Sequence, residues 1–208
     1  EDGYGNVIEA TPGAGVTLDI EALRASRRTG VTTAACGVCG RASIEDLLAV
    51  VSPVAAGSTV TSAELERALA ALEGAQKNFA RTGGLHAAAV LDARGEVLAF
   101  AEDVGRHNAV DKVIGRLVAD GRVPDPEGRH ARLLAVSGRS SFEIVQKAAV
   151  ARIPIVVAVS APSSLAVDLA QAMGMTLVGF ARKAGCNIYT HPERVVTPTP
   201  RDPKGAVR

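Results

Sequence analysis

The C-terminal half of the chain repeats one pattern, in which an apolar run leads through a polar loop into a helical period. The apolar runs occupy residues 133–136, 155–159 and 176–180. The first two are followed by helical patterns at 142–151 and 164–173. Continuous apolar strands that alternate with helices are typical of a parallel sheet segment that is covered on both faces. This half of the chain therefore predicts an α/β fold.

Residues 61–80 carry the clearest helical period. Thr61 and Glu64 have the spacing of a capping box, in which the two residues satisfy each other's backbone amides at the start of a helix. The apolar residues of the segment fall on one face, which consists of Leu65, Leu69, Leu72, Ala75 and Phe79. The pattern predicts one amphipathic helix that ends before Gly83.

A pair of strands and a second helix follow. Residues 85–92 and 96–101 have strand patterns, and the intervening Ala93-Arg94-Gly95 is typical of a hairpin turn. Residues 106–118 have a helical period whose predicted inward face carries Val110, Val113, Ile114 and Leu117.

The two ends of the chain have weaker patterns. Residues 16–20 alternate apolar and polar side chains, which predicts a half-buried strand. Residues 29–60 predict a long loop, and loops of that length are usually functional. We therefore expect an N-terminal part at 1–60, an α/β core at 61–190 and a proline-rich, disordered tail at 191–208.

Composition removes several classes of function. The chain has 208 residues, 23 of them basic and 22 acidic, and only 3% are aromatic, so neither the charge nor the stacking side chains of a nucleic-acid binder are present. No apolar run approaches the roughly 18–20 residues of a membrane helix, and no signal-peptide pattern precedes residue 20. Three cysteines do not make a disulfide framework. We expect a soluble, cytoplasmic protein with reduced thiols.

Cys36 and Cys39 form a Cys-x-x-Cys pair in which a glycine follows each cysteine. Such a pair serves as a redox dithiol, as half of a zinc site or as a sulfur carrier. A structural zinc site needs four ligands, and the sequence has no second Cys-x-x-Cys or His-x-x-x-His pattern. A thioredoxin-like dithiol begins a helix after a strand, whereas this pair lies in a glycine-rich stretch. The sequence favours neither of these uses, and the choice stays open at this point.

Polar loops follow the apolar runs of the C-terminal half. Ligands of open α/β sheets bind beyond the carboxyl ends of the strands. Ser140 and Ser163 are placed to cap helices, whose N-termini attract phosphate groups, and Arg139 and Arg182 would add paired donors. The loops predict an anionic, phosphate-bearing ligand. The alternative is that the serines are ordinary helix caps.

A dense polar cluster at 102–112 joins a strand to a helix. Arg106, His107 and Asn108 supply three kinds of hydrogen-bond donor there, which favours a binding role. The alternative is a solvated helix start that Asp103 caps. His86, at the start of a strand, is a ligand or acid–base residue in one interpretation and a hydrogen-bonded structural residue in the other.

Five linked motifs occur in order along the chain: Ala35-Cys36-Gly37-Val38-Cys39-Gly40, Gly83-Gly84-Leu85-His86-Ala87-Ala88, Glu102-Asp103-Val104-Gly105-Arg106-His107-Asn108-Ala109-Val110-Asp111-Lys112, Ser137-Gly138-Arg139-Ser140-Ser141-Phe142-Glu143 and Ser160-Ala161-Pro162-Ser163-Ser164-Leu165-Ala166. From about Cys36 to Tyr189 the chain resembles the FdhD family, the sulfur carriers required for active formate dehydrogenase. Members usually have further N-terminal residues, so we expect this chain to be truncated or processed.

The resemblance implies a three-layer α/β/α fold with a cytidine-deaminase-like mixed sheet, no catalytic zinc and a homodimer. It implies that Cys36 carries a persulfide received from a cysteine desulfurase and that Cys39 assists. The sulfur would pass to the molybdenum (or tungsten) bis(molybdopterin guanine dinucleotide) cofactor before its insertion into formate dehydrogenase. GDP, as a fragment of that cofactor, is expected to bind.

The candidate cofactor-binding residues come from the resemblance and from the polar loops. The resemblance points to the segment Phe180, Ala181, Arg182, Lys183, Ala184 and Gly185. The loops and the polar cluster add His86, Arg106, His107, Ser137, Arg139, Ser140 and Ser141. No metal ligand is assigned. The alternative function is a non-catalytic zinc- or nucleotide-binding module that regulates or chaperones the cofactor.

Overall fold

A computed structural model of the chain describes residues 11–21, 44–49, 51–54, 57, 59–124, 131–182 and 185–196. Residues 11–21 belong to a separate N-terminal unit that spans residues 1–34, and the rest belong to a unit at 35–208. The strand expected at 16–20 is wrong, because residues 16–19 have no regular structure and Ile20 begins a helical turn. Val16, Leu18 and Ile20 are each at least 43% exposed, so the alternating pattern buries no face.

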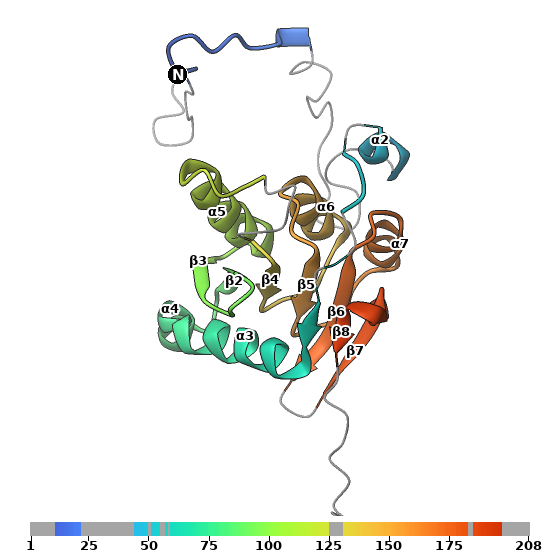
Figure 1. Cartoon of the computed structure of the whole chain (residues 1–208). Helices are drawn as coiled ribbons and strands as arrows, with labels where there is room; N and C mark the ends of the chain where they lie inside the picture. Colours follow the sequence, from blue (N-terminus) through green and yellow to red (C-terminus); the bar gives the residue numbers. More distant parts are fainter. Residues whose placement is uncertain are drawn as a thin grey trace, which may run out of the picture. The chain divides into compact units, whose positions relative to one another are not determined.

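A six-stranded mixed sheet forms the centre of the larger unit (Figure 1). Its order is β3-β2-β4-β5-β6-β7. Strands β4, β5 and β6 are parallel, and the pairs β2–β3, β2–β4 and β6–β7 are antiparallel. The predicted hairpin and parallel segment are thus confirmed. The strands are β2 (His86–Leu91), β3 (Val97–Asp103), β4 (Leu133–Val136), β5 (Ile155–Ala158), β6 (Thr176–Arg182) and β7 (Gly185–Thr190).

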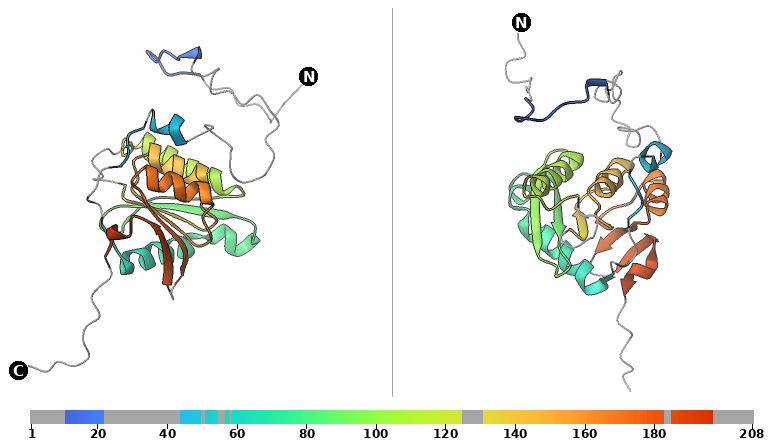
Figure 2. Two further views of the ribbon diagram at one scale, coloured as in Figure 1. Left: turned by 90° about the vertical axis from the view of Figure 1, so that its right-hand side faces the viewer. Right: turned by 45° about the horizontal axis from the view of Figure 1, so that its top comes forward.

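Helices cover both faces of this sheet, which confirms the three-layer α/β/α prediction (Figure 2). On one face lie α5 (Arg106–Ala119), α6 (Phe142–Val150) and α7 (Ser164–Ala172). On the other lie α3 (Ser62–Ala75) and α4 (Lys77–Thr82). The core accordingly has two parts, one between the sheet and α5–α7 and one between the sheet and α3. The short helix α2 (Ile44–Leu48) adds Leu47 to the first part, where it is 1% exposed.

The capping box predicted at the start of α3 is present. The Thr61 amide donates to Glu64 Oε2 at 2.6 Å, and the Glu64 amide donates to Thr61 Oγ1 at 3.2 Å. The single helix predicted for 61–80 is wrong, because it breaks at Gln76. The Glu102 carboxylate accepts from the Asn78 and Phe79 amides and so begins a second helix. As a result Phe79 leaves the predicted apolar face and is 42% exposed.

The C-terminal stretch begins with ordered elements. A 3₁₀ turn, η1 (Pro192–Arg194), leads into β8 (Val195–Val196), which pairs in parallel with β1 (Val60–Thr61). The disorder predicted for 191–208 is therefore wrong for residues 191–196. The pairing of β8 with β1 and the burial of Arg194 fix the position of this segment. Residues 197–208 lie outside the described residues.

Candidate functional site

The loops that follow β4 and β5 lie beside the C-terminal part of β6, at the carboxyl end of the parallel strands. The Ser163 amide donates to the Ser140 carbonyl at 3.0 Å, and Ser140 forms a parallel bridge with Pro162. The Phe180 amide in turn donates to the Ser160 carbonyl at 3.2 Å. Backbone hydrogen bonds therefore join the two loops and the C-terminal part of β6 into one edge, which is where open α/β sheets bind ligands.

The start of β2 joins the same edge, because β2 runs antiparallel to β4. The Ala87 amide donates to Ser137 Oγ at 2.8 Å, and the Ser137 amide donates to the Ala87 carbonyl at 3.0 Å. A Cβ added at Gly138 would lie 3.2 Å from His86 Nδ1 and 3.6 Å from Arg106 Cδ. His86, Arg106 and the loop after β4 thus lie close together, and a side chain at position 138 would crowd the His86 ring.

Asp103 fixes the junction that presents Arg106 and His107. Its Oδ1 accepts from the Gly105 amide at 2.9 Å and from Asn108 Nδ2 at 3.1 Å, and its Oδ2 lies 2.5 Å from Lys112 Nζ. The Lys112 ammonium and the Gly105 amide lower the pKa of Asp103 to about 2. The N-cap of α5 is Gly105, so Asp103 stabilises the turn before the helix rather than capping it.

His107 connects the start of α5 to the start of α6. Its Nε2 lies 2.7 Å from Ser141 Oγ, and its Nδ1 lies 3.8 Å from Glu143 Oε2. Ser141 is the N-cap of α6, so the prediction that Ser140 caps this helix is wrong by one residue. The predicted cap at Ser163 is confirmed, since its Oγ accepts from the Ala166 amide at 3.2 Å.

Positive charge gathers around the two histidines. Burial first, and then the Arg106 and Arg139 guanidinium groups, lower the pKa of His86. Burial also lowers the pKa of His107, where Arg106 and Lys147 add to the effect and Glu143 opposes it. Guanidinium groups that disfavour a protonated histidine favour an anion in the same place. This end of the sheet therefore suits a negatively charged ligand.

Ser140 is the most buried member of the predicted set. It is 1% exposed, and its Oγ has no hydrogen-bond partner among the residues that the structure describes. Arg139, directly before it, is exposed. The loop after β4 thus places an exposed guanidinium beside a buried hydroxyl that has unused hydrogen-bonding capacity.

The segment that begins at Phe180 has an irregular backbone. Phe180 has a positive φ of 51° and is 42% exposed, and the register of β6 with β7 shifts between Gly179 and Arg182. Arg182 is exposed, whereas Ala181 is 2% exposed in the core. Gly185 is exposed, with a φ of 145°. Phe180 and Arg182 therefore offer side chains to a ligand, and Ala181 offers only its backbone.

Some predicted residues lie outside the described ranges. These are Cys36, Cys39, Lys183 and Ala184. Among the residues inside those ranges, no group of three or more His, Cys, Asp or Glu side chains is arranged to hold a metal ion. Likewise, no helix in the described part is long and apolar enough to cross a membrane.

Sequence reasoning missed the residues that shape the site rather than contact the ligand. Gly138 and Gly179 permit close packing: a Cβ on Gly179 would lie 2.9 Å from both Pro162 Cδ and Tyr189 Cε2. Lys147 binds the Glu143 carboxylate at 2.9 Å and the Asp111 carboxylate at 2.6 Å. The four-residue spacing of Glu143 and Lys147 on one helix was the only signal in the sequence for this network.

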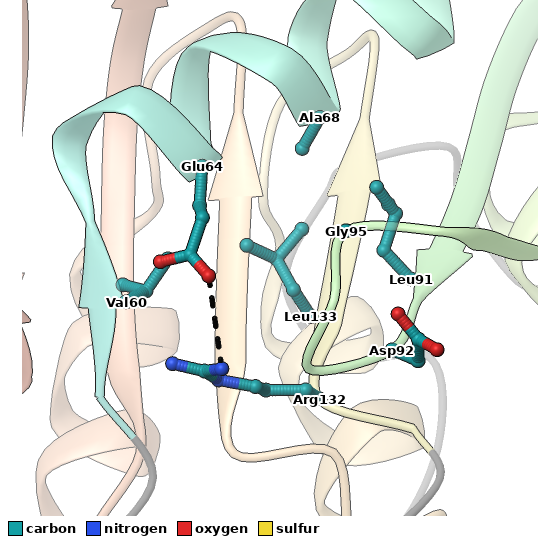
Figure 3. Close-up of a pocket in the computed structure, with 8 residues that line it drawn as sticks. All are labelled: Val60, Glu64, Ala68, Leu91, Asp92, Gly95, Arg132 and Leu133. Carbon is teal, nitrogen blue, oxygen red and sulfur yellow. Dashed lines mark ion pairs between the residues drawn. The ribbon is translucent and has the colours of Figure 1, made fainter.

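A separate pocket lies at the other end of the sheet, beside the start of β4 (Figure 3). Its main charged groups pair with each other, since Arg132 lies 3.8 Å from Glu64 and donates to the Ala93 carbonyl. Its empty volume of about 240 Å³ includes space that is open to solvent. We assign it no ligand. It is lined by Val60, Glu64, Ala68, Leu91, Asp92, Gly95, Arg132 and Leu133.

Comparison with known proteins gives consistent matches. The model of the FdhD/NarQ family matches residues 6–196. The sulfur carrier protein FdhD of Anaeromyxobacter dehalogenans strain 2CP-1 is 50% identical over 197 residues, which cover 94% of this chain and 68% of the relative. The protein of the same name from Mycolicibacterium paratuberculosis is 48% identical over 202 residues, which cover 94% and 71%. A crystal structure of a proposed formate dehydrogenase accessory protein from Desulfotalea psychrophila matches with a TM-score of 0.64 and 30% identity, over 73% of this chain and 62% of that one.

Proposed function

Because this chain belongs to the FdhD/NarQ family, we propose that it is a sulfur carrier that serves formate dehydrogenase. The sulfur comes from a cysteine desulfurase, and its acceptor is the molybdenum bis(molybdopterin guanine dinucleotide) cofactor, which this protein binds as a substrate. In this proposal the protein works in the cytoplasm as a homodimer. Curated relatives that carry the name sulfur carrier protein FdhD support the proposal.

The observation that carries the ligand proposal is the edge formed by the loops after β4 and β5 and the C-terminal part of β6. It combines the Arg106 and Arg139 charges beside His86 with the start of α6, and helix starts of this kind bind phosphate oxygens. The guanine dinucleotide brings both phosphates and a base. We assign the phosphates to this edge and the base to the Phe180 segment, whose exposed ring suits stacking on a base.

Sulfur loading requires a nucleophile, for which we propose Cys36. Its thiolate attacks the terminal sulfur of the desulfurase persulfide, a new S–S bond forms on Cys36, and the desulfurase cysteine leaves as a thiolate. No net oxidation or reduction accompanies this exchange. Cys39, three positions along the chain, assists. The third cysteine, Cys186, is exposed on β7, and loss of hydration and the Glu66 carboxylate raise the pKa of its thiol, which reduces its thiolate fraction.

Mass spectrometry of the intact chain after incubation with a cysteine desulfurase and cysteine tests this proposal. We expect the wild type to gain the mass of one sulfur atom. Cys36→Ala should abolish the gain, whereas the matched control Cys186→Ser should keep it. Loading that survives Cys36→Ala would remove Cys36 from the carrier role. Stoichiometric zinc in the purified protein, together with no sulfur uptake, would favour the regulatory module instead.

A further inference from the structure

Helices α6 and α7 follow neighbouring parallel strands and both begin at a serine, but the two serines behave differently. Ser163 caps α7, since its Oγ accepts from the Ala166 amide at 3.2 Å. Ser141 holds the equivalent position before α6, but its Oγ lies 2.7 Å from His107 Nε2. In the part of the chain that the structure describes, the Ser141 side chain makes no capping bond to α6.

The contact between His107 and Ser141 affects whether the first backbone amides of α6 can bind an anion. The first amides of a helix have no acceptor within the helix, and a serine at the cap normally accepts from one of them. The Ser141 hydroxyl is held by His107 and accepts from none of these amides. The Ile144 amide donates to the Ser141 carbonyl at 3.1 Å, whereas the Phe142 and Glu143 amides have no acceptor among the described residues. A free helix start carries partial positive charge and oriented N–H donors, which suit an anionic oxygen.

A second observation points to a ligand at the same place. Ser140 directly precedes the cap, is 1% exposed and has no hydrogen-bond partner for its Oγ within the described ranges. A buried hydroxyl without a partner destabilises the folded protein, and a bound oxygen would remove that penalty. The Arg106 and Arg139 charges, which act on His86 beside this loop, favour the same kind of partner.

One carboxylate in the first turn of α6 would oppose an anion, and it is already neutralised. Glu143 Oε1 lies 2.9 Å from Lys147 Nζ, and its Oε2 faces His107 Nδ1 at 3.8 Å. Lys147 also binds the Asp111 carboxylate from α5 at 2.6 Å. The network thus holds both acidic groups in ion pairs.

We propose that His107 is a positioning residue, which holds the Ser141 hydroxyl away from the first amides of α6 and so keeps that helix start open for a phosphate-class oxygen of the ligand. This inference rests on the proposed function, because it assigns one group of that ligand to the start of α6. His107 acts through Ser141 and needs no contact with the ligand.

Calorimetric titration of the full chain with GDP tests the inference through a double-mutant cycle. His107→Phe keeps a ring of similar size but releases Ser141, which can then cap α6, so we expect affinity for GDP to fall about tenfold. In a Ser141→Ala background no hydroxyl can cap the helix. There, the same His107→Phe substitution should cause no further loss. His107→Gln retains a polar group that can hold Ser141, so its affinity should stay within about twofold of the wild type.

Three results would overturn the inference. Equal losses for His107→Phe in both backgrounds would mean that His107 does not act through Ser141. No loss in the wild-type background, or a His107→Gln variant as weak as His107→Phe, would do the same. Circular dichroism checks the fold of each variant, and His107→Leu replaces His107→Phe should that variant not fold. A wild-type chain that does not bind GDP would instead reject the proposed ligand and this inference with it.

Discussion

At the scale of single residues, the site contains two histidines, His86 and His107, whose pKa is lowered by burial and by positive neighbours. His86 is partly buried, and burial, Arg106 and Arg139 each lower its pKa below the ordinary value of 6.5. The folded protein therefore binds fewer protons than the unfolded chain just below about pH 6.5, and stability rises with pH through that window. A bound anion adds negative charge near His86, which favours the protonated imidazole. Ligand binding and protonation of His86 are therefore linked.

We predict that GDP binding near about pH 6 takes up protons, because phosphate charge beside His86 raises its pKa in the complex. Calorimetry in two buffers of different ionisation enthalpy measures this uptake. His86→Gln should reduce it, and the remainder should report His107, whose pKa is lowered in the same way. Proton release on binding, or an uptake that His86→Gln leaves unchanged, would contradict the placement of phosphate beside His86.

At the scale of helices and strands, replacing two glycines by alanine is expected to change the free energy of unfolding in opposite directions. Gly179 in β6 faces Pro162 Cδ and Tyr189 Cε2, each 2.9 Å from an added Cβ, whereas Gly115 in α5 is exposed and has nothing within 4 Å. Gly179→Ala should lower the free energy of unfolding by about 1–3 kcal/mol through overpacking. Gly115→Ala should raise it by about 0.5–1 kcal/mol, because glycine is a poor helix former. Urea unfolding compares the two, and similar effects would contradict this account of the packing.

Elements whose pattern is local were predictable from the sequence. The apolar runs of β4, β5 and β6 and the period of α5 reflect burial that each segment carries in its own residues. The break at Gln76 was not predictable, because the carboxylate that begins α4 comes from Glu102, a residue 24 positions after Asn78. The strand predicted at 16–20 was wrong because its alternating apolar side chains have no surface to pack against within the described residues, and Val16, Leu18 and Ile20 remain exposed.

The adjacency of the candidate site's loops was predictable, and its detailed geometry was less so. Topology brings the carboxyl ends of parallel strands together, so the sequence indicated that the polar loops at Ser137 and Ser160 would lie side by side. The partner of each side chain depends on contacts between elements. The His107–Ser141 contact joins residues 34 positions apart, and Ser141, the N-cap of α6, makes no side-chain capping bond in the described part of the chain. No local pattern encodes such a contact.

At the scale of the whole molecule, the proposal gives the carrier cysteine and the ligand site separate tasks. Ligand that binds only the folded state stabilises it by about 2.7 kcal/mol at a concentration of 100 Kd. We therefore predict that GDP raises the thermal midpoint of the wild type and of Cys36→Ala alike, while only the wild type accepts sulfur from a desulfurase.

The Arg106→Ala variant should show the reverse behaviour. It should load sulfur normally but lose most of the stabilisation by GDP, because Arg106 belongs to the charged edge around His86. Differential scanning fluorimetry and intact mass spectrometry measure the two properties on the same samples. If Arg106→Ala lost both, with its fold intact by circular dichroism, loading and binding would share one site, and the division of tasks between the Cys36 stretch and the strand ends would be wrong.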